Sequence, residues 1–232
     1  MKTYNFPCRN IGFTLVEMAI VLVVVGLLVS AFLAPLSAQR DLKDYTETKL
    51  RLEQIREALY GYAIINGKLP CPTTQPNPAD VSYGTGDVAC LLTSPAGALP
   101  WKDLGVQEVD AWGTQRNEIS DPWIGYWTYR VDPNFANTFS LLTKTQATNP
   151  SAGANINIVK SDGASLTAAT ERAVAVVCSN GKNRVANGQN ATFETVNPIY
   201  QDDFQTPVFD DKCIWINRPS LFNRMVSAGK LP

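Results

Sequence analysis

The distribution of apolar residues divides the chain unevenly. Residues 1–12 are mixed in polarity, and residues 13–36 then form an apolar run of 24 residues in which Glu17 is the only charge. As an α-helix rising ~1.5 Å per residue, this run would be ~36 Å long, enough to cross a hydrocarbon core of ~30 Å. The pattern predicts a transmembrane helix over residues 13–36, preceded by a cytoplasmic leader at residues 1–12.

Beyond the apolar run, apolar positions continue to recur at helical spacing. Charged residues occupy the other faces as far as about residue 66, so the pattern predicts an amphipathic continuation of the helix over residues 37–66. The positions of the expected buried stripe are Leu42, Tyr45, Leu52, Ile55, Leu59 and Tyr62 or Ala63. Asn66-Gly67 is a typical C-terminal cap, and Pro35 predicts a kink or local opening. A coiled-coil stalk is the alternative for residues 37–66, although its heptads are few and irregular.

Residues 67–232 predict a globular head outside the membrane. The segment 68–101 is dense in Pro and Gly, which favours a loop. Short β-branched or alternating runs bounded by turn residues predict an antiparallel sheet, with strands at 126–131, 138–142, 156–160, 173–179 and 213–217. A short C-terminal helix is expected after Asn217. The predicted fold class is α+β: a long N-terminal helix packed on an antiparallel β-sheet head that ends in a short helix.

Charge and composition restrict the classes of function. The formal net charge is -1, and beyond the leader there are 18 bases against 21 acids, which does not favour nucleic-acid binding. Histidine is absent, so no imidazole is available for a catalytic triad or a metal site. The sequence also lacks a Gly-rich phosphate loop, a Gly-x-Ser-x-Gly elbow and a Cys-x-x-Cys pair. We therefore expect neither an enzyme nor an organic cofactor.

The orientation of the membrane segment depends on few charges. Lys2 and Arg9 in the leader favour a cytoplasmic N-terminus and an exported head. A cleaved secretory signal, with a small-residue site near 36–38, is the alternative for the N-terminus. Its apolar core would be much longer than the usual ~7–15 residues and would contain Glu17. A carboxylate inside a membrane costs ~2.5–3.5 kcal/mol, so Glu17 is expected to have a functional partner or to lie near the hydrated interface.

Cysteine usage fits an exported head. Of five cysteines, Cys8 lies in the leader, and an even four remain at Cys71, Cys90, Cys178 and Cys213. An even number in an exported domain predicts two disulfides, for which three pairings exist. We favour the sequential pairing, Cys71 with Cys90 and Cys178 with Cys213, because the second pair lies in strand-like runs that could be neighbours.

The stretch Gly12-Phe13-Thr14-Leu15-Val16-Glu17 resembles the N-terminal processing motif of the type IV pilin and type II secretion pseudopilin superfamily. The resemblance implies cleavage after Gly12 by a prepilin peptidase, which also methylates the new N-terminus at Phe13. It further implies that Glu17 pairs with the Phe13 amine of a neighbouring subunit. Opposite charges that are each costly in a low dielectric attract strongly when they meet, which gives this pairing a physical basis.

The resemblance also implies partners and a location. They are other pilin-like subunits, the filament assembly machinery and the bacterial inner membrane, which the subunit leaves for a pilus or pseudopilus. The length and the looped head favour a minor or specialised subunit over an abundant one. A membrane-tethered periplasmic enzyme or binding protein with a simple N-terminal anchor is the rival hypothesis.

Two features of the head leave alternatives open. Asp110-Ala111-Trp112-Gly113 and the Tyr-rich run at 126–131 are similar, more loosely, to segments of pilin-like heads. The tryptophans Trp101, Trp112, Trp123 and Trp127 most often act as aromatic plugs in such a context, and a sugar-binding platform is the alternative. The acidic pairs Asp202-Asp203 and Asp210-Asp211 are candidate calcium ligands, although their spacing fits no EF-hand loop.

Overall fold

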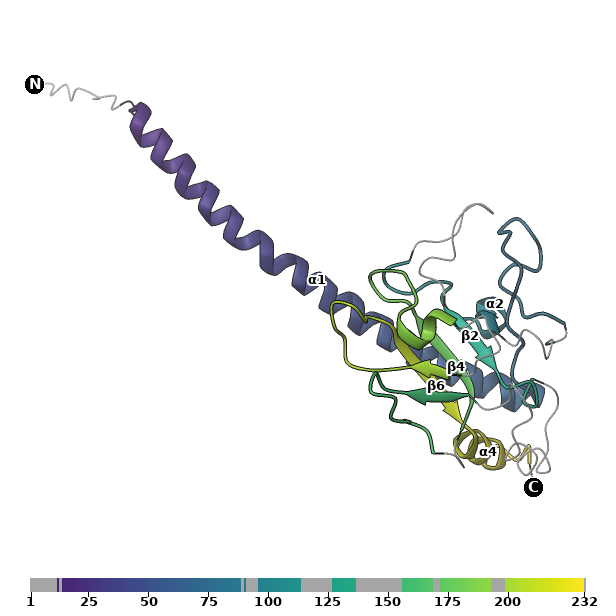
Figure 1. Cartoon of the computed structure of the whole chain (residues 1–232). Helices are drawn as coiled ribbons and strands as arrows, with labels where there is room; N and C mark the ends of the chain where they lie inside the picture. The colour runs from purple at the N-terminus through teal and green to yellow at the C-terminus, as the bar shows by residue number, and fades with distance from the viewer. Residues whose placement is uncertain are drawn as a thin grey trace, which may run out of the picture. The chain divides into compact units, whose positions relative to one another are not determined.

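The computed structural model describes residues 12, 14–88, 90, 96–113, 127–136, 156–168, 172–192 and 199–231, with the backbone alone for residues 31–36 and 192. The chain divides into two compact units, an N-terminal unit of Met1–Lys43 and a C-terminal unit of Asp44–Pro232. The helix α1 (Leu15–Asn66) contributes residues to both units (Figure 1).

The helix α1 is one uninterrupted element of 52 residues. Gly67 follows it in the left-handed conformation, with φ at 67°, and donates its N–H to the Ala63 carbonyl at 2.8 Å. This confirms the predicted cap at Asn66-Gly67. The helix also continues without a break through position 35, where the sequence predicts a kink or local opening, because one lost hydrogen bond removes little from a helix of this length.

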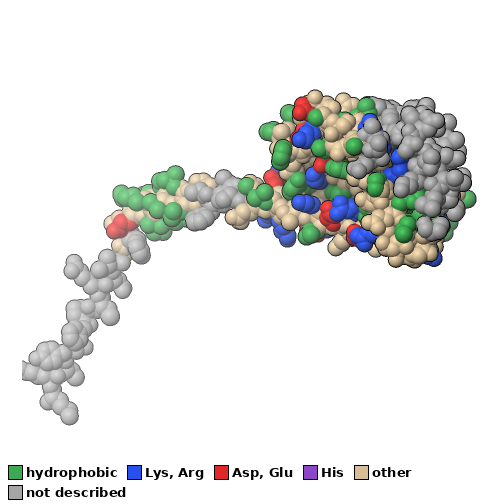
Figure 2. Space-filling view, turned by 90° about the horizontal axis from the view of Figure 1, so that it is seen from below, with side chains coloured by type: hydrophobic (Ala, Val, Ile, Leu, Met, Phe, Trp, Pro, Cys, Tyr) green, Lys and Arg blue, Asp and Glu red, His purple; other side chains and the backbone are tan. Residues whose placement is uncertain are grey.

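The N-terminal unit exposes apolar side chains along α1. From Leu15 to Val29 the large apolar side chains have exposed fractions between 48 and 87%. Figure 2 shows them gathered along this stretch of the helix. Within the described residues, no helix combines the length and the hydropathy needed to cross a membrane.

The C-terminal unit contains a four-stranded antiparallel sheet in the order β1-β2-β4-β6. Its strands are β1 (Ala96–Ala98), β2 (Thr128–Val131), β4 (Ala173–Ser179) and β6 (Lys212–Asn217). A second sheet pairs β3 (Asn157–Val159) with β5 (Ile199–Gln201) in parallel. The remaining elements are α2 (Trp101–Leu104), the 3-10 helix η1 (Gly188–Thr192) and α4 (Arg218–Ser227). Figure 1 shows β2, β4 and β6 side by side.

The predicted α+β class is confirmed, but only some of the individual strands and helices match their predicted positions. The expected runs at 126–131, 156–160, 173–179 and 213–217 contain β2, β3, β4 and most of β6, whereas the predicted strand at 138–142 lies outside the described residues. The sequence pattern does not predict β1, β5 or α2, and it indicates only antiparallel pairing. A segment as short as β1 has little periodicity, and its pairing with β2 becomes visible only in the fold. On its other side, Gly97 lets the backbone of Thr73 approach closely: an added Cβ would lie 2.8 Å from the Thr73 carbonyl oxygen.

Two apolar clusters lie on opposite faces of the main sheet. The larger one joins α1 to the sheet and to α4, and its α1 residues are Leu52, Ile55, Leu59, Tyr60 and Ala63. The smaller cluster contains Cys178, Cys213 and side chains of β3 and β5. The predicted stripe on α1 is therefore buried from Leu52 onward. Leu42 is 67% exposed, so its predicted burial is wrong: the described members of the larger cluster on α1 begin at Leu52.

The helix α4 closes the larger cluster. It buries Leu221, Phe222 and Met225, as its apolar spacing predicts, and Phe222 makes an edge contact with Phe135 at 6.0 Å between ring centroids. Asn217 occupies the predicted N-cap position, but its side chain makes no capping hydrogen bond.

Candidate functional site

The helix α1 begins with reciprocal hydrogen bonds between Thr14 and Glu17. The Thr14 N–H and hydroxyl both donate to Glu17 Oε2 at 2.8 Å, and the Glu17 N–H donates to Thr14 Oγ1 at 3.2 Å. This is a capping box, which satisfies amides that would otherwise lack partners at the start of a helix. The motif-based prediction gives Thr14 no role of its own, although Thr-x-x-Glu is the usual signal of a capping box.

Of the two predicted processing residues, Gly12 and Phe13, only Gly12 belongs to the described residues. Gly12 is exposed, and Phe13 lies outside the described residues. Glu17 is also exposed, and among the described residues no hydrogen bond reaches its Oε1. The carboxylate therefore holds the start of its own helix with one oxygen while the other remains available to a further donor.

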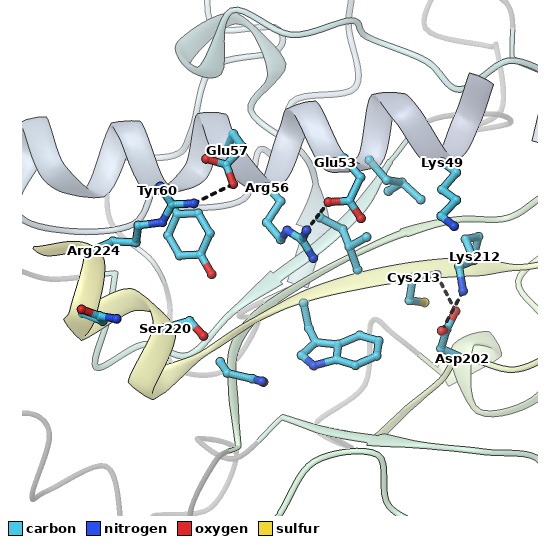
Figure 3. A pocket seen from close by; sticks show the side chains of 15 residues that line it. Lys49, Glu53, Arg56, Glu57, Tyr60, Asp202, Lys212, Cys213, Ser220 and Arg224 are labelled. Atoms are coloured by element: carbon cyan, nitrogen blue, oxygen red, sulfur yellow. Dashed lines mark hydrogen bonds and ion pairs between the residues drawn. The ribbon is translucent and has the colours of Figure 1, made fainter. Parts of the chain in front are cut away.

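A groove of about 640 Å³ runs between α1 and β6 in the C-terminal unit. In Figure 3, Glu53, Arg56 and Tyr60 point from α1 toward β6, and Lys212 and Asp202 lie toward one end. The ion pairs Arg56–Glu53 and Arg224–Glu57 (3.1 Å) lie along the helix side. We call this hollow the β6 groove. The sequence gives no sign of it, because its walls come from segments about 150 residues apart.

A disulfide joins Cys71 to Cys90 within the Pro-rich and Gly-rich loop. The bridge closes a segment that has little core of its own. By the chain-entropy model, closing a loop of this length stabilises the folded state by about 3 kcal/mol. A mixed cluster holds the same loop: Lys102 lies over the rings of Tyr83 and Trp101 at 5.4 and 5.3 Å, and those rings meet edge to face.

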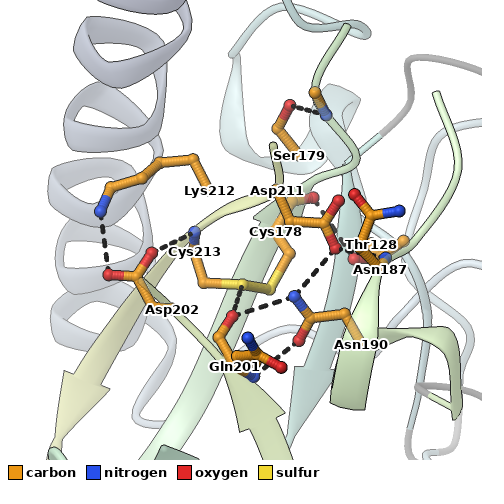
Figure 4. The surroundings of a disulfide bond; sticks show 11 residues. Thr128, Cys178, Ser179, Asn187, Asn190, Gln201, Asp202, Asp211, Lys212 and Cys213 are labelled. Atoms are coloured by element: carbon orange, nitrogen blue, oxygen red, sulfur yellow. Dashed lines mark hydrogen bonds and ion pairs between the residues drawn. A yellow bond between two sulfur atoms is a disulfide. The ribbon is translucent and has the colours of Figure 1, made fainter. Parts of the chain in front are cut away.

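A second disulfide joins Cys178 to Cys213 across the main sheet. The two residues are direct partners on β4 and β6, with their Cα atoms 4.1 Å apart. Figure 4 shows this bridge between the side chains of Asp202 and Asp211. Both disulfides are those of the sequential pairing that the sequence favoured.

The Asp-x-Trp-Gly segment is an internal brace between α1 and the sheet. Asp110 is buried, and its Oδ1 accepts the N–H groups of Trp112 and Gly113 at 3.0 and 2.7 Å. Its Oδ2 accepts the Ser179 hydroxyl at 2.6 Å, at the end of β4, while the Ala111 N–H donates to Thr48 Oγ1 of α1 at 3.2 Å. Burial raises the pKa of Asp110. The turn that begins at Asp110 thus binds both to α1 and to the end of β4, which are remote from it in sequence.

One of the four tryptophans considered as aromatic plugs lies in the core of the head. Trp127 is fully buried in the larger cluster, and its indole N–H donates to the Gln107 carbonyl at 2.9 Å. This agrees with the predicted role as an aromatic plug with a locally bonded N–H. Trp101 is half-buried beside Lys102, Trp112 belongs to the brace described above, and Trp123 lies outside the described residues.

Asp202 and Asp203 contact different parts of the chain. Asp202 accepts the Cys213 N–H at 3.1 Å and forms an ion pair with Lys212 at 2.9 Å. Asp203 accepts the hydroxyl and the N–H of Ser161 at 2.5 and 2.8 Å, and these bonds lower the pKa of Asp203 to about 2. Each carboxylate fixes a loop.

Asp210 and Asp211 also serve as hydrogen-bond acceptors for loops. Asp210 accepts the Asn183 N–H at 2.8 Å, and the fully buried Asp211 accepts from Asn187 N–H and Asn190 Nδ2 at 2.8 and 2.9 Å. Burial raises the pKa of Asp211 to about 6. The part of the chain that the structure describes contains no group of three or more acidic or cysteine side chains able to hold a metal ion. The calcium prediction therefore has no structural support among these residues.

Comparison with known families places a motif at the N-terminus. The family described as the prokaryotic N-terminal methylation motif matches residues 8–33, which include Gly12, Thr14 and Glu17. No curated protein and no solved structure matches the chain. The motif implies processing by a prepilin peptidase and assembly with other pilin-like subunits, and it is typical of membrane-anchored pilin-type proteins. The chain thus carries the hallmark motif of the type IV pilin and pseudopilin superfamily.

Proposed function

We propose that this protein is a structural subunit of a type IV pilus-like or type II secretion pseudopilus-like filament. The observation that carries the proposal is the methylation motif at residues 8–33, which leads directly into the long helix α1. Families with this motif consist of structural subunits. The α+β head and its two disulfides are consistent with that role in an oxidising, exported compartment.

The subunit is made as a precursor in the bacterial inner membrane. Residues 13–36, with Glu17 as their only charge, form its single membrane-spanning segment, and the bases of the leader keep the N-terminus in the cytoplasm. The head then lies in the periplasm. Prepilin peptidase cleaves after Gly12 and methylates Phe13, and the assembly machinery moves the mature subunit into the filament.

Assembly depends on Glu17. Placing a carboxylate in lipid costs ~2.5–3.5 kcal/mol, so the membrane-bound subunit gains free energy when Glu17 meets a positive charge. The mature Phe13 amine of a neighbouring subunit supplies that charge. The capping box with Thr14 supports this step, because it fixes the carboxylate at the start of the helix and uses only Oε2. No described residue donates to Glu17 Oε1, which can accept from the amine.

The apolar surface of α1 provides the remaining attraction. The exposed side chains from Leu15 to Val29 pack against the same helices of neighbouring subunits along the filament axis. The head, with its disulfide-closed loop, faces outward. We assign it to a minor or specialised subunit because so much of the head is loop.

The N-terminus of the mature protein tests this proposal. We expect mass spectrometry of the protein from sheared filaments to find an N-methylated Phe13 as the first residue. Residues 1–12 still attached to functional protein would contradict it and favour a membrane-tethered enzyme or binding protein. A first residue near 39 would instead indicate a secretory signal.

A further inference from the structure

The strand β6 presents a free edge to the β6 groove. In the sheet order β1-β2-β4-β6, one side of β6 pairs with β4, and none of the described strands pairs with the other side. The Cys213 N–H donates to Asp202 Oδ1 at 3.1 Å, so it faces away from β4. Because the direction of backbone groups alternates along a strand, the N–H and C=O of Trp215 face the same free edge.

The free edge is short and closed at both ends. Asp202 occupies the position of a strand partner at Cys213, as Figure 4 shows, and α4 begins at Arg218. The stretch from Ile214 to Asn217 is left, which is ~10 Å of strand edge. An added segment would therefore pair over about three residues, with the Trp215 backbone at its centre.

Charged side chains line the groove beside this edge, and their cations outnumber their carboxylates by one. Lys212, Arg56 and Arg224 are each paired with a carboxylate of the same groove. Lys49 also lines the groove and is exposed, and among the described residues it has no ion-pair partner. Figure 3 shows Lys49 on the α1 side and Lys212 on the opposite side of the same end. An incoming carboxylate is the complementary group.

The position of Trp215 favours a peptide over a sugar. Sugar sites commonly present an aromatic ring as a platform, but the Trp215 side chain packs against the smaller core cluster on the face of the sheet opposite α1. Because Trp215 is half-buried and also lines the groove, β6 offers its unpaired backbone together with part of this ring, and the ring is not an open platform. Unpaired strand backbone next to a charged groove is the usual basis of recognition by strand addition.

We propose that the β6 groove binds an extended, acidic peptide segment of a partner protein, which adds to β6 as a further strand. The Trp215 N–H and C=O form the central hydrogen bonds, and Lys49 pairs with an acidic side chain of the segment. This would make the head a receptor for a strand, independently of how its N-terminal helix assembles.

Hydrogen exchange on the full-length chain in detergent micelles tests the proposal. The probes are capped hexapeptides of alternating Val and Thr with one Glu moved through each position, and a matched set has Lys in place of Glu. We expect at least one Glu probe, at millimolar concentration, to slow exchange in the segment 212–217 about tenfold while the rest of the chain is unchanged. The Lys probes should give no such protection.

Charge reversal at Lys49 provides the matched comparison. K49E should weaken binding of the effective probe about five- to tenfold, because a weak attraction becomes a repulsion of similar size. K43E is the control, since Lys43 is exposed on the same helix and does not line the groove. The proposal is overturned if no Glu probe protects 212–217, if Lys probes protect it equally, or if K43E and K49E weaken binding to the same extent.

Discussion

The two units of the chain use charge in opposite ways. In the C-terminal unit, the carboxylates of Asp110, Asp202 and Asp203 accept hydrogen bonds from remote parts of the same chain. In the N-terminal unit, Glu17 stands among exposed apolar side chains, and within the part of the chain that the structure describes its carboxylate bonds only to Thr14, three residues away. A charge that is satisfied internally stabilises a fold, whereas one with a free oxygen on an unburied helix is suited to a partner.

The two units also differ in how far their apolar side chains are buried. The C-terminal unit encloses two apolar clusters, while the large apolar side chains from Leu15 to Val29 are all at least 48% exposed. Exposed apolar surface of this extent marks a site of interaction with protein or lipid. Folding of the head and assembly through the helix should therefore be separable by mutation.

Removal of the Glu17 carboxylate should have the largest effect. Glu17→Ala should abolish incorporation into filaments, because the Phe13 amine of the neighbouring subunit loses its partner, while the head remains folded. Immunoblots of sheared filaments against whole cells measure incorporation, and protease resistance of the head measures folding. Incorporation at the normal level would show that the charge pair is not needed.

Two further variants separate charge from capping. Glu17→Gln keeps an acceptor for Thr14 but lacks the charge, and Thr14→Ala keeps the charge but lacks the hydroxyl of the capping box. We expect Glu17→Gln to fail in assembly nearly as completely as Glu17→Ala. Thr14→Ala should weaken the start of the helix by ~0.5–2 kcal/mol and reduce assembly only partly. The reverse order of severity would assign Glu17 to helix stability alone.

The disulfide across the main sheet should dominate the stability of the head. Replacing Cys178 and Cys213 together with Ala should lower the free energy of unfolding by ~2–5 kcal/mol, because the cross-link no longer restricts the unfolded chain. Urea unfolding of the full chain in micelles, followed by tryptophan fluorescence, measures the change. Cys8→Ala is the control, since Cys8 lies in the leader. Equal urea midpoints for both variants would mean that the bridge contributes nothing to stability.

Periodicity along the chain explains which elements of the fold the sequence could predict. Leu52, Ile55 and Leu59 are predictable because one face of a long helix repeats every three or four residues, and β4 is predictable because seven successive residues suit a buried strand. The strand β5 has only three residues and pairs in parallel with β3, some 40 residues earlier, so local pattern gives little sign of it.

The candidate site was predictable in the N-terminal unit and less so in the head. Gly12 and Glu17 belong to a contiguous motif, so their spacing alone carries the signal. The partner of Asp203 is Ser161, 42 residues away, and adjacent acidic residues suggested calcium because that contact cannot be seen in the sequence. The β6 groove was missed for the same reason: its walls meet only after folding.

The pH dependence of stability should distinguish buried from exposed carboxylates within the head. Burial raises the pKa of Asp132 from 3.8 to about 6, so folding favours its protonated form. Its contribution to stability is fully present below pH ~3.8 and is lost as the pH rises through ~6. The free energy of unfolding should therefore fall by roughly 1–3 kcal/mol over this interval, and Asp132→Asn should flatten part of that fall. Asp211, whose pKa is also raised to about 6, and Asp110, whose pKa burial also raises, account for the remainder.

Asp203→Asn is the matched control for the pH experiment. Hydrogen bonds from Ser161 lower the pKa of Asp203 to about 2, so its contribution is present above pH ~3.8 and is lost only as the pH falls through ~2. Urea unfolding at a series of pH values should show the same decline between pH ~4 and ~6 in Asp203→Asn as in the unaltered protein. A flattened decline in that variant, or an unchanged one in Asp132→Asn, would contradict the assignment to burial.

The smallest effect is expected where both partners of an ion pair are exposed. Arg224 of α4 pairs with Glu57 of α1 at 3.1 Å, and both side chains are more than half exposed, so water screens most of their attraction. A double-mutant cycle with Arg224→Ala and Glu57→Ala, measured by urea unfolding, should give a coupling energy of ~0.2–1 kcal/mol. Arg224 also lies over the Tyr60 ring at 5.3 Å, so the single variant Arg224→Ala should cost more than Glu57→Ala. A coupling of several kcal/mol would mean that this pair is shielded from water in the folded protein. The pair would then belong with the buried carboxylates that stabilise the head, although it lies at the surface.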